Sequence, residues 1–518
     1  MKKRVFLTAL TLVVLLLAGC ADGGPEGTFV DVSPTPPQTA AVLPTALPEA
    51  SPTWGEEEYW VLFLNVGRAD AALICANGQY WLVDTGTKDG ADALVATLGN
   101  LGVTRLEGVF LTHTHGDHAG GAKRLAGVIP VAMFYRAAIT TLTDKGKDKL
   151  SGIAEDAGVP ETKLAAGDAL ELNGAALEVL GPVVTNADDD NDNSLVFKLT
   201  ANGHTVLFTG DMQFAEEETL VDRDVSCEVL KVANHGNPDA TGEAFAAAAA
   251  PRVAVISTDT LEDTDSANAR VRGALSGADI YVTEHFAVGV MVDLSGGEIA
   301  VSDPGFDPAS QAAALRAGIP GMLVNRENTL GADYTPEGLV DIASYDIPAL
   351  TLKSDGLMGY GEAVAALGDM MGAAKDAGIS GFYLVSAYRT YAEQRALWDE
   401  KVADDPAYGA DPSIPVVTAY PGASEHQTGL AFDISAVNAK ALSARFADTP
   451  QGEWLYHNAW RFGFILRYPG DVQAQAETGI VFEPWHFRYV GKPLAAYLYR
   501  TGITLERFYS TYLSEGAA

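Results

Sequence analysis

The sequence predicts a multidomain protein made of two successive blocks that each mix helices with strands. Its 518 residues are enough for two or three domains with full hydrophobic cores. Strand-like and helix-like stretches alternate over Tyr59–Asp303, and a second mixed block covers Pro304–Ala518. A turn-rich run, Asp303–Pro308, lies where the two blocks meet. We therefore expect one domain at residues 58–302 and another at residues 303–518.

Short apolar runs with β-branched and aromatic residues predict the strands of the first block. These runs are Trp60–Leu64, Ala71–Cys75, Tyr80–Asp84, Gly108–Thr112 and Pro251–Ser257. The pair Asn202-Gly203 predicts a hairpin turn between two further runs, Ser194–Leu199 and Thr205–Thr209. The expected helices are Ala91–Leu101 and Ala246–Ala250 in the first block, and Tyr360–Ala377 and Ala392–Lys401 in the second.

The amino-terminal residues indicate export. A basic start is followed by the apolar run Val5–Leu17, which is too short for a permanent membrane span, and by Leu17-Ala-Gly-Cys20. This segment resembles a bacterial lipoprotein signal, which implies cleavage of residues 1–19 and a lipid on Cys20. Residues 20–57 are rich in Pro, Gly, Thr and Ser and predict a spacer. We expect an extracytoplasmic protein that is lipid-anchored to the bacterial cell membrane.

The charge balance disfavours a nucleic-acid partner. Asp and Glu number 68 against 34 Lys and Arg, which gives a formal net charge of −34. Tight non-specific binding to a phosphate backbone requires clustered basic residues. The two other cysteines, Cys75 and Cys227, lie in apolar runs and predict small buried residues, with no framework of disulfides.

The second block carries a set of side chains typical of a catalytic zinc site. His426 and Asp433 lie within the run Ser424–Asp433, and His486 follows later in the chain. Three protein ligands leave a fourth position for water. Glu483 lies three residues before His486 and is close enough to reach that water. A metal ion with a nearby carboxylate favours hydrolysis, because the ion acidifies water and the carboxylate moves the proton.

These residues resemble the VanY-like D-alanyl-D-alanine carboxypeptidases, zinc peptidases that trim the stem peptides of bacterial cell-wall precursors. The resemblance runs from about Leu323 to about Tyr509. Its matching stretches are Leu323–Asn328, Ser386–Tyr391, Ser424–Asp433, Phe462–Pro469 and Glu483–Tyr489. It implies an α+β zinc D,D-peptidase domain in which His426, Asp433 and His486 bind zinc and Glu483 is the general base.

The same resemblance gives Arg389 a role in substrate binding. A guanidinium group can bind a carboxylate through two parallel hydrogen bonds, and a carboxypeptidase must recognise a free C-terminus. Gln394 and Ser424 are expected to make supporting polar contacts to the peptide. Taken alone, Arg389 would be read as a solvated arginine on a turn before a helix.

The first block holds a second group of potential metal ligands. His113, His115, Asp117 and His118 lie within six positions, directly after a predicted strand. Asp211 and His235 each follow a later strand. Three histidines and an aspartate on one such loop are difficult to explain by packing alone. Asp84, at the end of a predicted strand, is a candidate to hold one of the histidines in place.

This pattern resembles the metallo-β-lactamase superfamily, a four-layer αββα sandwich that holds one or two metal ions. It is most similar to the soluble hydrolase domain of ComEC-type DNA-uptake proteins. The matching stretches are Leu64–Asp70, Leu82–Gly86, Asn191–Val196, Leu207–Met212 and Leu230–Gly236. The resemblance implies that His113 and His115 hold one metal, that Asp117, His118 and His235 hold a second, and that Asp211 bridges the two.

The chain departs from that pattern at several positions. No third histidine for the first metal occurs near Asn191–Ser194, and Asn65, Asn234 and Asn237 replace more usual residues. One or two Zn²⁺ or Mn²⁺ ions are therefore both open, because affinity depends on ligand number and type. A phosphodiester or another ester-like bond is the hypothesis for the substrate.

The sequence as a whole predicts a membrane-tethered metallohydrolase with two active domains, of which the second removes terminal D-alanine from peptidoglycan stem peptides. One alternative is an endopeptidase of the same zinc fold, which would cut within a stem or cross-link. Another is a non-catalytic wall-binding or sensing lipoprotein with structural metal. Structural zinc is usually closed by four ligands rich in cysteine, which disfavours this second alternative.

Overall fold

The structure is a computed structural model that describes residues 58–142, 146–186, 189–316 and 318–514. The expected signal of residues 1–19, Cys20 and the spacer at residues 20–57 lie outside the described residues. Among the helices of the described part, none combines the length and apolar character that crossing a membrane requires.

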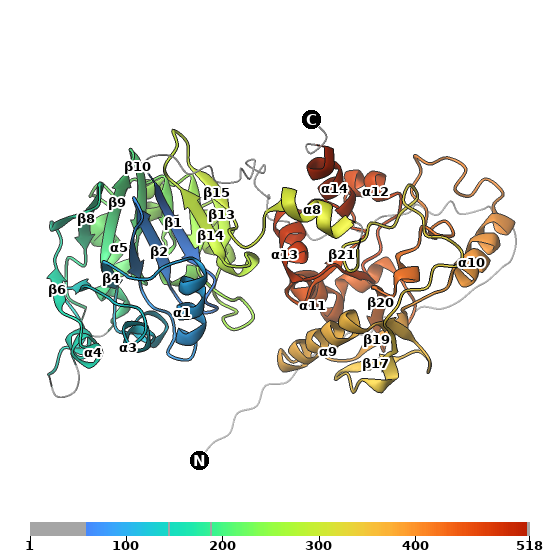
Figure 1. The fold of residues 1–518 in the computed structure, drawn as a ribbon, viewed down its shortest axis with the longest axis horizontal. Coiled ribbons are helices and arrows are strands. Elements are labelled where there is room, and N and C mark those ends of the chain that lie inside the picture. The colour runs from blue at the N-terminus through green and yellow to red at the C-terminus, as the bar shows by residue number, and fades with distance from the viewer. Residues whose placement is uncertain (1–57, 143–145, 187–188, 317, 515–518) are drawn as a thin grey trace, which may run out of the picture. The chain divides into compact units, whose positions relative to one another are not determined.

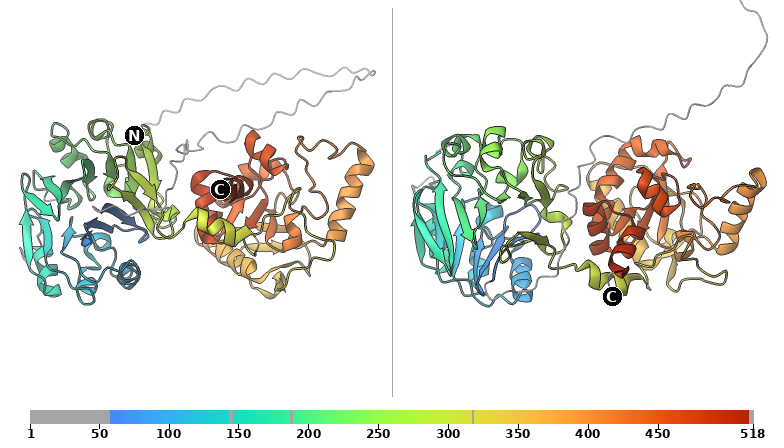
Figure 2. Two further views of the ribbon diagram at one scale, coloured as in Figure 1. Left: turned by 45° about the horizontal axis from the view of Figure 1, so that its top comes forward. Right: turned by 90° about the horizontal axis from the view of Figure 1, so that it is seen from above.

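The first domain contains two sheets, which Figures 1 and 2 show as adjoining layers. The larger sheet has the order β15-β14-β1-β2-β3-β4-β5-β6 and the smaller one the order β13-β12-β11-β10-β9-β8-β7. The strands of the larger sheet are β1 Tyr59–Leu64, β2 Ala72–Ala76, β3 Gln79–Val83, β4 Gly108–Leu111, β5 Phe134–Ala137, β6 Glu161–Leu164, β14 Gly289–Asp293 and β15 Ala300–Ser302. Those of the smaller sheet are β7 Ala169–Leu172, β8 Ala175–Gly181, β9 Val196–Ala201, β10 His204–Phe208, β11 Val229–Lys231, β12 Val253–Ile256 and β13 Asp279–Val282.

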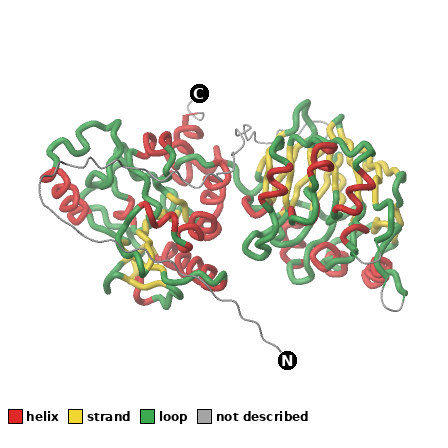
Figure 3. Tube along the Cα trace, turned by 180° about the vertical axis from the view of Figure 1, so that it is seen from behind, coloured by secondary structure: helices red, strands yellow, loops and turns green. Residues whose placement is uncertain are grey.

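Helices cover the outer face of each sheet, as the helix and strand colours of Figure 3 show. The α-helices are α1 Ala91–Asn100, α2 Gly116–Ala119, α3 Ala122–Ala126, α4 Lys149–Ala157, α5 Phe214–Leu220, α6 Glu243–Ala249 and α7 Ala269–Ala274. The 3₁₀ turns are η1 Asn191–Asn193, η2 Ala233–Gly236 and η3 Thr283–His285.

Three hydrophobic cores lie between the layers of this domain. Phe63 on β1 and Phe208 on β10 meet between the two sheets, with ring centroids 5.8 Å apart. Leu94 on α1 packs into a second core on the outer face of the larger sheet, and Phe245 on α6 packs into a third on the smaller sheet. Alternate residues of the strands point to opposite faces, which is how one sheet serves two cores. The predicted four-layer αββα arrangement is confirmed.

The second domain is built on a five-stranded sheet of order β17-β19-β20-β22-β21, with a separate pair β16-β18. The strands are β16 Leu339–Asp341, β17 Leu350–Leu352, β18 Met358–Tyr360, β19 Phe382–Ser386, β20 Ala431–Ala436, β21 Phe464–Leu466 and β22 His486–Tyr489. Its α-helices are α8 Pro308–Arg316, α9 Gly361–Asp376, α10 Tyr391–Asp404, α11 Pro450–Asn458, α12 Val472–Thr478, α13 Lys492–Thr501 and α14 Leu505–Ser514. Its 3₁₀ turns are η4 Ile342–Ser344, η5 Glu425–Thr428, η6 Ala444–Asp448 and η7 Ala459–Phe462.

Apolar faces of the helices bury this second sheet. Leu367 and Met371 on α9 pack with Phe432 on β20 in the main core of the domain. A smaller core joins α8, α13 and α14. Helix α10 begins with a capping box, in which Thr390 and Glu393 each accept a backbone N–H of the other. This cap fixes the start of the helix directly after Arg389.

The buried carboxyl group of Glu216 on α5 leads to a test of stability against pH. Glu216 is 2% exposed, and its Oε1 accepts the backbone N–H of Val183 at 2.8 Å. Burial raises the pKa of Glu216 from 4.5 to about 7. The folded chain thus binds this proton more tightly than the unfolded chain, so stability falls as the pH rises from 4.5 to about 7.

We expect Glu216→Gln to raise the melting temperature of the first domain by about 4 °C at about pH 8, because the amide still accepts the N–H and carries no charge. At about pH 4 the two proteins should melt alike, because the carboxyl group is then protonated in both the folded and unfolded states. Calorimetry of the full chain at both pH values measures the difference. An equal shift at the two pH values would contradict the titration of Glu216.

Candidate metal centres

Two of the three candidate ligands in the second domain are placed by strand pairing. Asp433 on β20 lies directly opposite His486 on β22 in the antiparallel register. Their side chains leave the same face of the sheet, and His486 Nδ1 lies 3.2 Å from Asp433 Oδ1. Residues 53 positions apart in the chain therefore meet because the two strands are neighbours.

The third candidate ligand, His426, lies in the turn η5 that leads into β20. Gly429 ends this turn with φ 73°, and a Cβ there would lie 2.6 Å from a side-chain carbon of Leu339. His426 Nδ1 donates to the backbone carbonyl of Ala387 at 2.6 Å, which leaves Nε2 free. That Nε2 lies 3.2 Å from Asp433 Oδ2.

These three side chains fit a metal ion. One ligand atom from each of His426, Asp433 and His486 lies within 4.8 Å of the others, and all three residues are buried. Asp433 Oδ1 is buried without a hydrogen-bond partner among the described residues. Burial opposes ionisation, but the two histidines hold the pKa of Asp433 below its usual range, so it is a carboxylate. Two imidazoles and one carboxylate form the donor set of an open zinc site.

Glu483 lies beside this trio. Its Oε2 is 3.5 Å from His486 Nδ1, and the residue is 7% exposed. Burial, with a smaller contribution from Asp433, raises the pKa of Glu483 to about 8. A buried carboxyl group with a pKa near neutrality can both take and return a proton.

Arg389 and Gln394 form a connected pair next to the ligands. Arg389 Nη2 lies 3.6 Å from Asp433 Oδ2 and donates to Ser386 Oγ at 3.0 Å. Its Nη1 donates to Gln394 Oε1 at 2.6 Å, and Gln394 Nε2 donates to the carbonyl of Ala419. Gln394 is 1% exposed, so both ends of its amide are used within the protein. Its geometry suits holding Arg389 in place rather than the peptide contact that we expected.

Ser424 completes the set of residues predicted for this site. It precedes η5 and is 4% exposed, directly before Glu425 and His426. The residues predicted for this site thus come from strands β20 and β22, helix α10, the turn η5 with Ser424 before it, and the loops that hold Arg389 and Glu483.

In the first domain, the candidate ligands lie on loops at the ends of strands. His113, His115, Asp117 and His118 follow β4, Asp211 follows β10, and His235 lies in η2 after β11. Strands β3 and β4 of the larger sheet are parallel, as are β10 and β11 of the smaller one, so within each sheet the two strands end at the same edge. His235 has φ 53°, a conformation that non-glycine residues adopt only where the surroundings enforce it.

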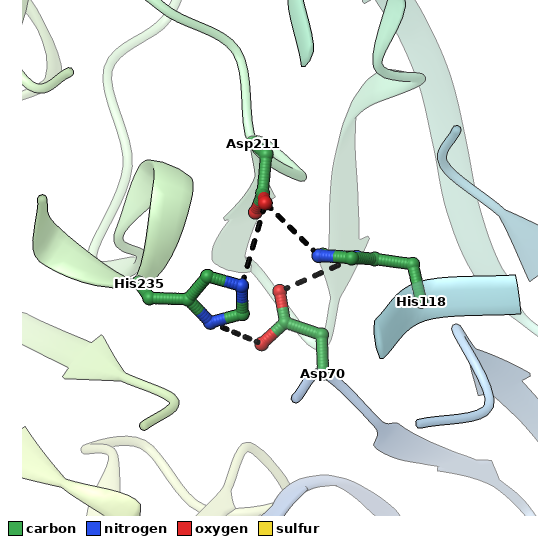
Figure 4. A group of neighbouring side chains, drawn as sticks. All are labelled: Asp70, His118, Asp211 and His235. Carbon is green, nitrogen blue, oxygen red and sulfur yellow. Dashed lines mark hydrogen bonds and ion pairs between the residues drawn. The ribbon is translucent and has the colours of Figure 1, made fainter. Parts of the chain in front are cut away.

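Asp211 is the residue on which the histidines converge, as Figure 4 shows. Its Oδ2 lies 3.0 Å from His118 Nε2, 3.3 Å from His235 Nε2 and 3.9 Å from His113 Nε2. Burial opposes its ionisation, but His118 and His235 hold the pKa of Asp211 well below its usual range. The same charge, acting against burial, raises the pKa of His235 to about 10. A site that draws protons this strongly also favours a metal cation.

Sequence reasoning did not assign Asp70, which lies on the other side of the two rings. Figure 4 shows its carboxylate on the Nδ1 side, 3.7 Å from His118 Nδ1 and 4.0 Å from His235 Nδ1. Lys231 Nζ lies 2.6 Å from Asp70 Oδ2, and both side chains are buried. Although Asp70, His118, Asp211 and His235 offer ligand atoms within 4.8 Å, the lysine occupies the position of a cation beside Asp70.

Hydrogen bonds to Nδ1 turn the Nε2 atoms toward Asp211. Asp84 Oδ2 lies 2.8 Å from His118 Nδ1, and the carbonyl of Ser257 lies 2.8 Å from His235 Nδ1. Metal-binding histidines usually have such a partner on the other ring nitrogen. His235 Nε2 and Asp211 Oδ1 are buried with no hydrogen bond within the described chain, which fits a cation at this point.

The remaining predicted ligands surround the same point. His113 Nε2 is buried and has no hydrogen-bond partner in the described ranges, and burial lowers the pKa of His113 to about 3. The His115 ring is exposed, with its centroid 4.7 Å from that of His113. Asp117 Oδ2 lies 3.5 Å from His235 Nε2. Of the six predicted residues, His113, His118 and His235 thus lie within 4 Å of Asp211, Asp117 adjoins His235, and the His115 ring contacts that of His113.

Family comparisons agree with the two sites. Residues 360–492 match the family model described as VanY, D-alanyl-D-alanine carboxypeptidase. Residues 64–260 match the family model of the metallo-beta-lactamase superfamily. Each match covers the candidate ligands of its own domain.

Individual relatives match one domain or the other. The bifunctional D-Ala-D-Ala dipeptidase and D-Ala-D-Ala carboxypeptidase VanXYC of Enterococcus gallinarum is 38% identical over 26% of this chain and 67% of its own length. Competence protein ComA of Neisseria gonorrhoeae is 30% identical over 41% of this chain and 28% of its own length. A solved mutant of a VanY D,D-pentapeptidase from a VanB-type resistance cassette, in complex with Zn(II), is 35% identical and covers 36% of this chain and 97% of that chain, with a TM-score of 0.29.

The chain spans 58 to 66% of the length of the first curated carboxypeptidase relatives that it matches. Both predicted family resemblances, including that to competence proteins, are confirmed. Residues 64–260 of the first domain match the model of the metallo-beta-lactamase superfamily, and through its second domain the chain belongs to the VanY family of D-alanyl-D-alanine carboxypeptidases.

Proposed function

We propose that the second domain is a zinc D-alanyl-D-alanine carboxypeptidase that removes the terminal D-alanine of peptidoglycan stem peptides. The observation that carries this proposal is the convergence of His426, Asp433 and His486, with the buried Glu483 beside them. The membership of the VanY family supports the same substrate class. The chain matches only part of the length of its first curated relatives. The proposed substrate and partners are therefore argued from the residues of this site.

The residues around the trio have distinct roles. A zinc ion held by the three ligands supplies a positive charge that polarises the scissile carbonyl and acidifies water. Glu483 takes the proton of the attacking water and returns it to the leaving amine. Arg389, fixed by Gln394 and Ser386, holds a negatively charged oxygen of the substrate next to the ligands.

A direct assay tests the proposal. The purified full chain with zinc is given a pentapeptide that ends in D-Ala-D-Ala, and free D-alanine is measured. Release of D-alanine supports a carboxypeptidase. Mass spectra of digested muropeptides separate this from the endopeptidase alternative, because loss of one alanine differs from a split peptide. Binding of wall fragments without turnover would favour the sensing alternative and contradict the proposal.

Arg389 provides a sharper test of substrate binding. Arg389→Lys keeps the charge but loses the fork of parallel donors, and we expect kcat/KM for D-alanine release to fall about 10–100-fold. Zinc content should stay unchanged, because Arg389 is not a ligand. The control is Arg395→Lys on α10, an exposed residue paired with Asp399 one helical turn away. If both variants keep wild-type kcat/KM, Arg389 does not bind substrate.

We also propose that the first domain is a metal-dependent hydrolase with a phosphodiester or related ester as its substrate. The convergence of His113, His118 and His235 on Asp211 supports one or two Zn²⁺ or Mn²⁺ ions. The acidic net charge disfavours long nucleic acids as substrates. The test gives the full chain Mn²⁺ or Zn²⁺ and measures cleavage of model phosphodiesters and oligonucleotides. No turnover on either would contradict this part.

We further propose, from the amino-terminal sequence, that the protein is a lipoprotein anchored through Cys20 on the outer side of the cell membrane. In that place, the second domain would meet its stem-peptide substrate. Cell fractionation of wild type and Cys20→Ala tests it: the variant should leave the membrane fraction. Retention of both proteins in the membrane would contradict the anchor.

A further inference from the structure

A buried network of charged side chains lies behind the metal centre of the second domain. Its centre is Glu425, the residue before His426, which is 0% exposed. Glu425 Oε1 lies 2.8 Å from Arg467 Nε and 2.7 Å from Arg488 Nη1. Arg467 uses its two terminal nitrogens on Glu506, at 2.8 and 2.5 Å. Two arginines and two glutamates make the network neutral, which makes its burial tolerable.

The two arginines are themselves held by the chain. Arg488 donates from Nη2 to the carbonyls of Pro320 and Met322 and from Nε to that of Tyr489. Arg488 is 0% and Arg467 2% exposed, so neither side chain has room to change conformation. Glu425 is therefore held rigidly through one of its two carboxylate oxygens.

The other oxygen of Glu425 faces a candidate metal ligand. Oε2 lies 3.8 Å from His486 Nε2. Both atoms are buried, and neither has a hydrogen-bond partner among the residues that the structure describes. Leaving a buried donor and a buried acceptor unpaired is costly, and a movement of about 0.6 Å would bring them to hydrogen-bond distance. The opposite ring atom, Nδ1, faces Asp433 and Glu483.

We infer that Glu425 is a positioning residue that accepts a hydrogen bond from the Nε2–H of His486 and so presents Nδ1 to the metal. The inference rests on the proposed function, in which His486 is a zinc ligand. His426 has the matching partner on its own ring, because its Nδ1 donates to the carbonyl of Ala387. Glu425 thus has two roles, since it neutralises two arginines with one oxygen and orients His486 with the other.

A glutamine in place of Glu425 cannot both pair with the two arginines and accept a hydrogen bond from His486. An amide offers one acceptor and one donor, so it cannot accept from both the arginines and His486. Whichever way the amide is turned, its NH₂ group meets a donor. We therefore expect Glu425→Gln to weaken zinc binding at this centre by about 10–100-fold, the usual effect of losing such a partner. Excess zinc should restore most of the turnover.

The matched control is Glu506→Gln, which removes the same charge from the same network. Glu506 contacts Arg467 through the nitrogens that do not touch Glu425, and it also accepts from Asn325. Both variants should lower the melting temperature, but Glu506→Gln should leave the zinc affinity within about threefold. The affinity of this centre alone is read from the ¹H–¹⁵N signals of His426 and His486 in ¹⁵N-histidine-labelled full chain, titrated with buffered zinc.

The outcomes are separable. Unchanged affinity in Glu425→Gln, or equal weakening in both variants, overturns the inference and makes the network purely structural. If Glu425→Gln does not fold, the spectrum of the zinc-loaded wild type decides, because the inference requires a slowly exchanging Nε2–H on His486. A wild type without zinc at this centre contradicts the proposed function itself. A wild type that binds zinc and releases D-alanine while Glu425→Gln keeps its affinity overturns only the inference.

Discussion

Replacing Glu483 with alanine should lower kcat for D-alanine release by about 10³-fold while zinc stays bound at the second domain. Glu483 lies beside His486 but is not one of the three residues whose ligand atoms converge. Removing it takes away the group that moves protons and leaves the metal ligands in place. Because burial raises the pKa of Glu483 to about 8, a protonated and a charged form are both within reach near neutral pH.

Two comparisons make this result specific. Glu483→Gln keeps the shape of the side chain but cannot take a proton, so it should lose activity to the same extent. Glu453→Ala removes an exposed glutamate from the first turn of α11 in the same domain and should change neither kcat nor zinc content. Zinc per chain is measured by mass spectrometry and D-alanine by an enzyme-coupled assay. Full activity in Glu483→Ala would show that another group is the base.

Much of the second site could be predicted because its signals are local. His426 and Asp433 belong to one short run, and Glu483 and His486 to another. The pairing of β20 with β22 then sets Asp433 opposite His486, which no spacing in the chain reveals. Equally local signals predicted the hairpin at Asn202 and the helices α9 and α10. The structure confirms these elements, with ends that differ by a few residues.

Residues that act from behind the ligands could not be predicted in the same way. Asp70 meets His118 and His235 only because loops that follow strands of both sheets come together there, and its neighbour Lys231 is the last residue of the apolar strand β11. The sequence did hold a signal, since a lysine or arginine within an apolar run must find a partner when it is buried. The same holds for Arg467, whose partners Glu425 and Glu506 are 42 and 39 residues away.

The exact ends of strands could not be predicted from the sequence either. Asp84 was expected as the last residue of a strand, but β3 ends at Val83 and Asp84 takes φ 58°. In that conformation its carboxylate accepts the N–H of Thr112 and lies 2.8 Å from His118 Nδ1. The sequence did mark Asp84 as a candidate partner of a metal-site histidine. The backbone turn that makes the contact depends on packing between β3 and β4.

Asp211→Asn should remove the metal of the first domain without affecting the second. Its Oδ2 is the common neighbour of His113, His118 and His235, so this one change affects the contacts of three candidate ligands. An amide has no negative charge to hold a cation, and metal affinity should fall by more than the roughly 10–100-fold typical of losing an outer partner. Cleavage of model phosphodiesters should vanish, while D-alanine release stays within about twofold of wild type.

The control for Asp211→Asn is Asp222→Asn, an exposed aspartate just after α5, which should keep both metals and both activities. Metal per chain, measured for the two variants side by side, separates loss of the ion from loss of the fold. Without Asp211, His118 and His235 also lose one of the charges that raise their pKa values, so both pKa values should fall even in metal-free protein. If Asp211→Asn keeps its metal, Asp211 is not a ligand. The cation would then lie on the side of the two histidine rings where Asp70 contacts Lys231. Loss of D-alanine release together with the metal would mean that the two domains depend on each other.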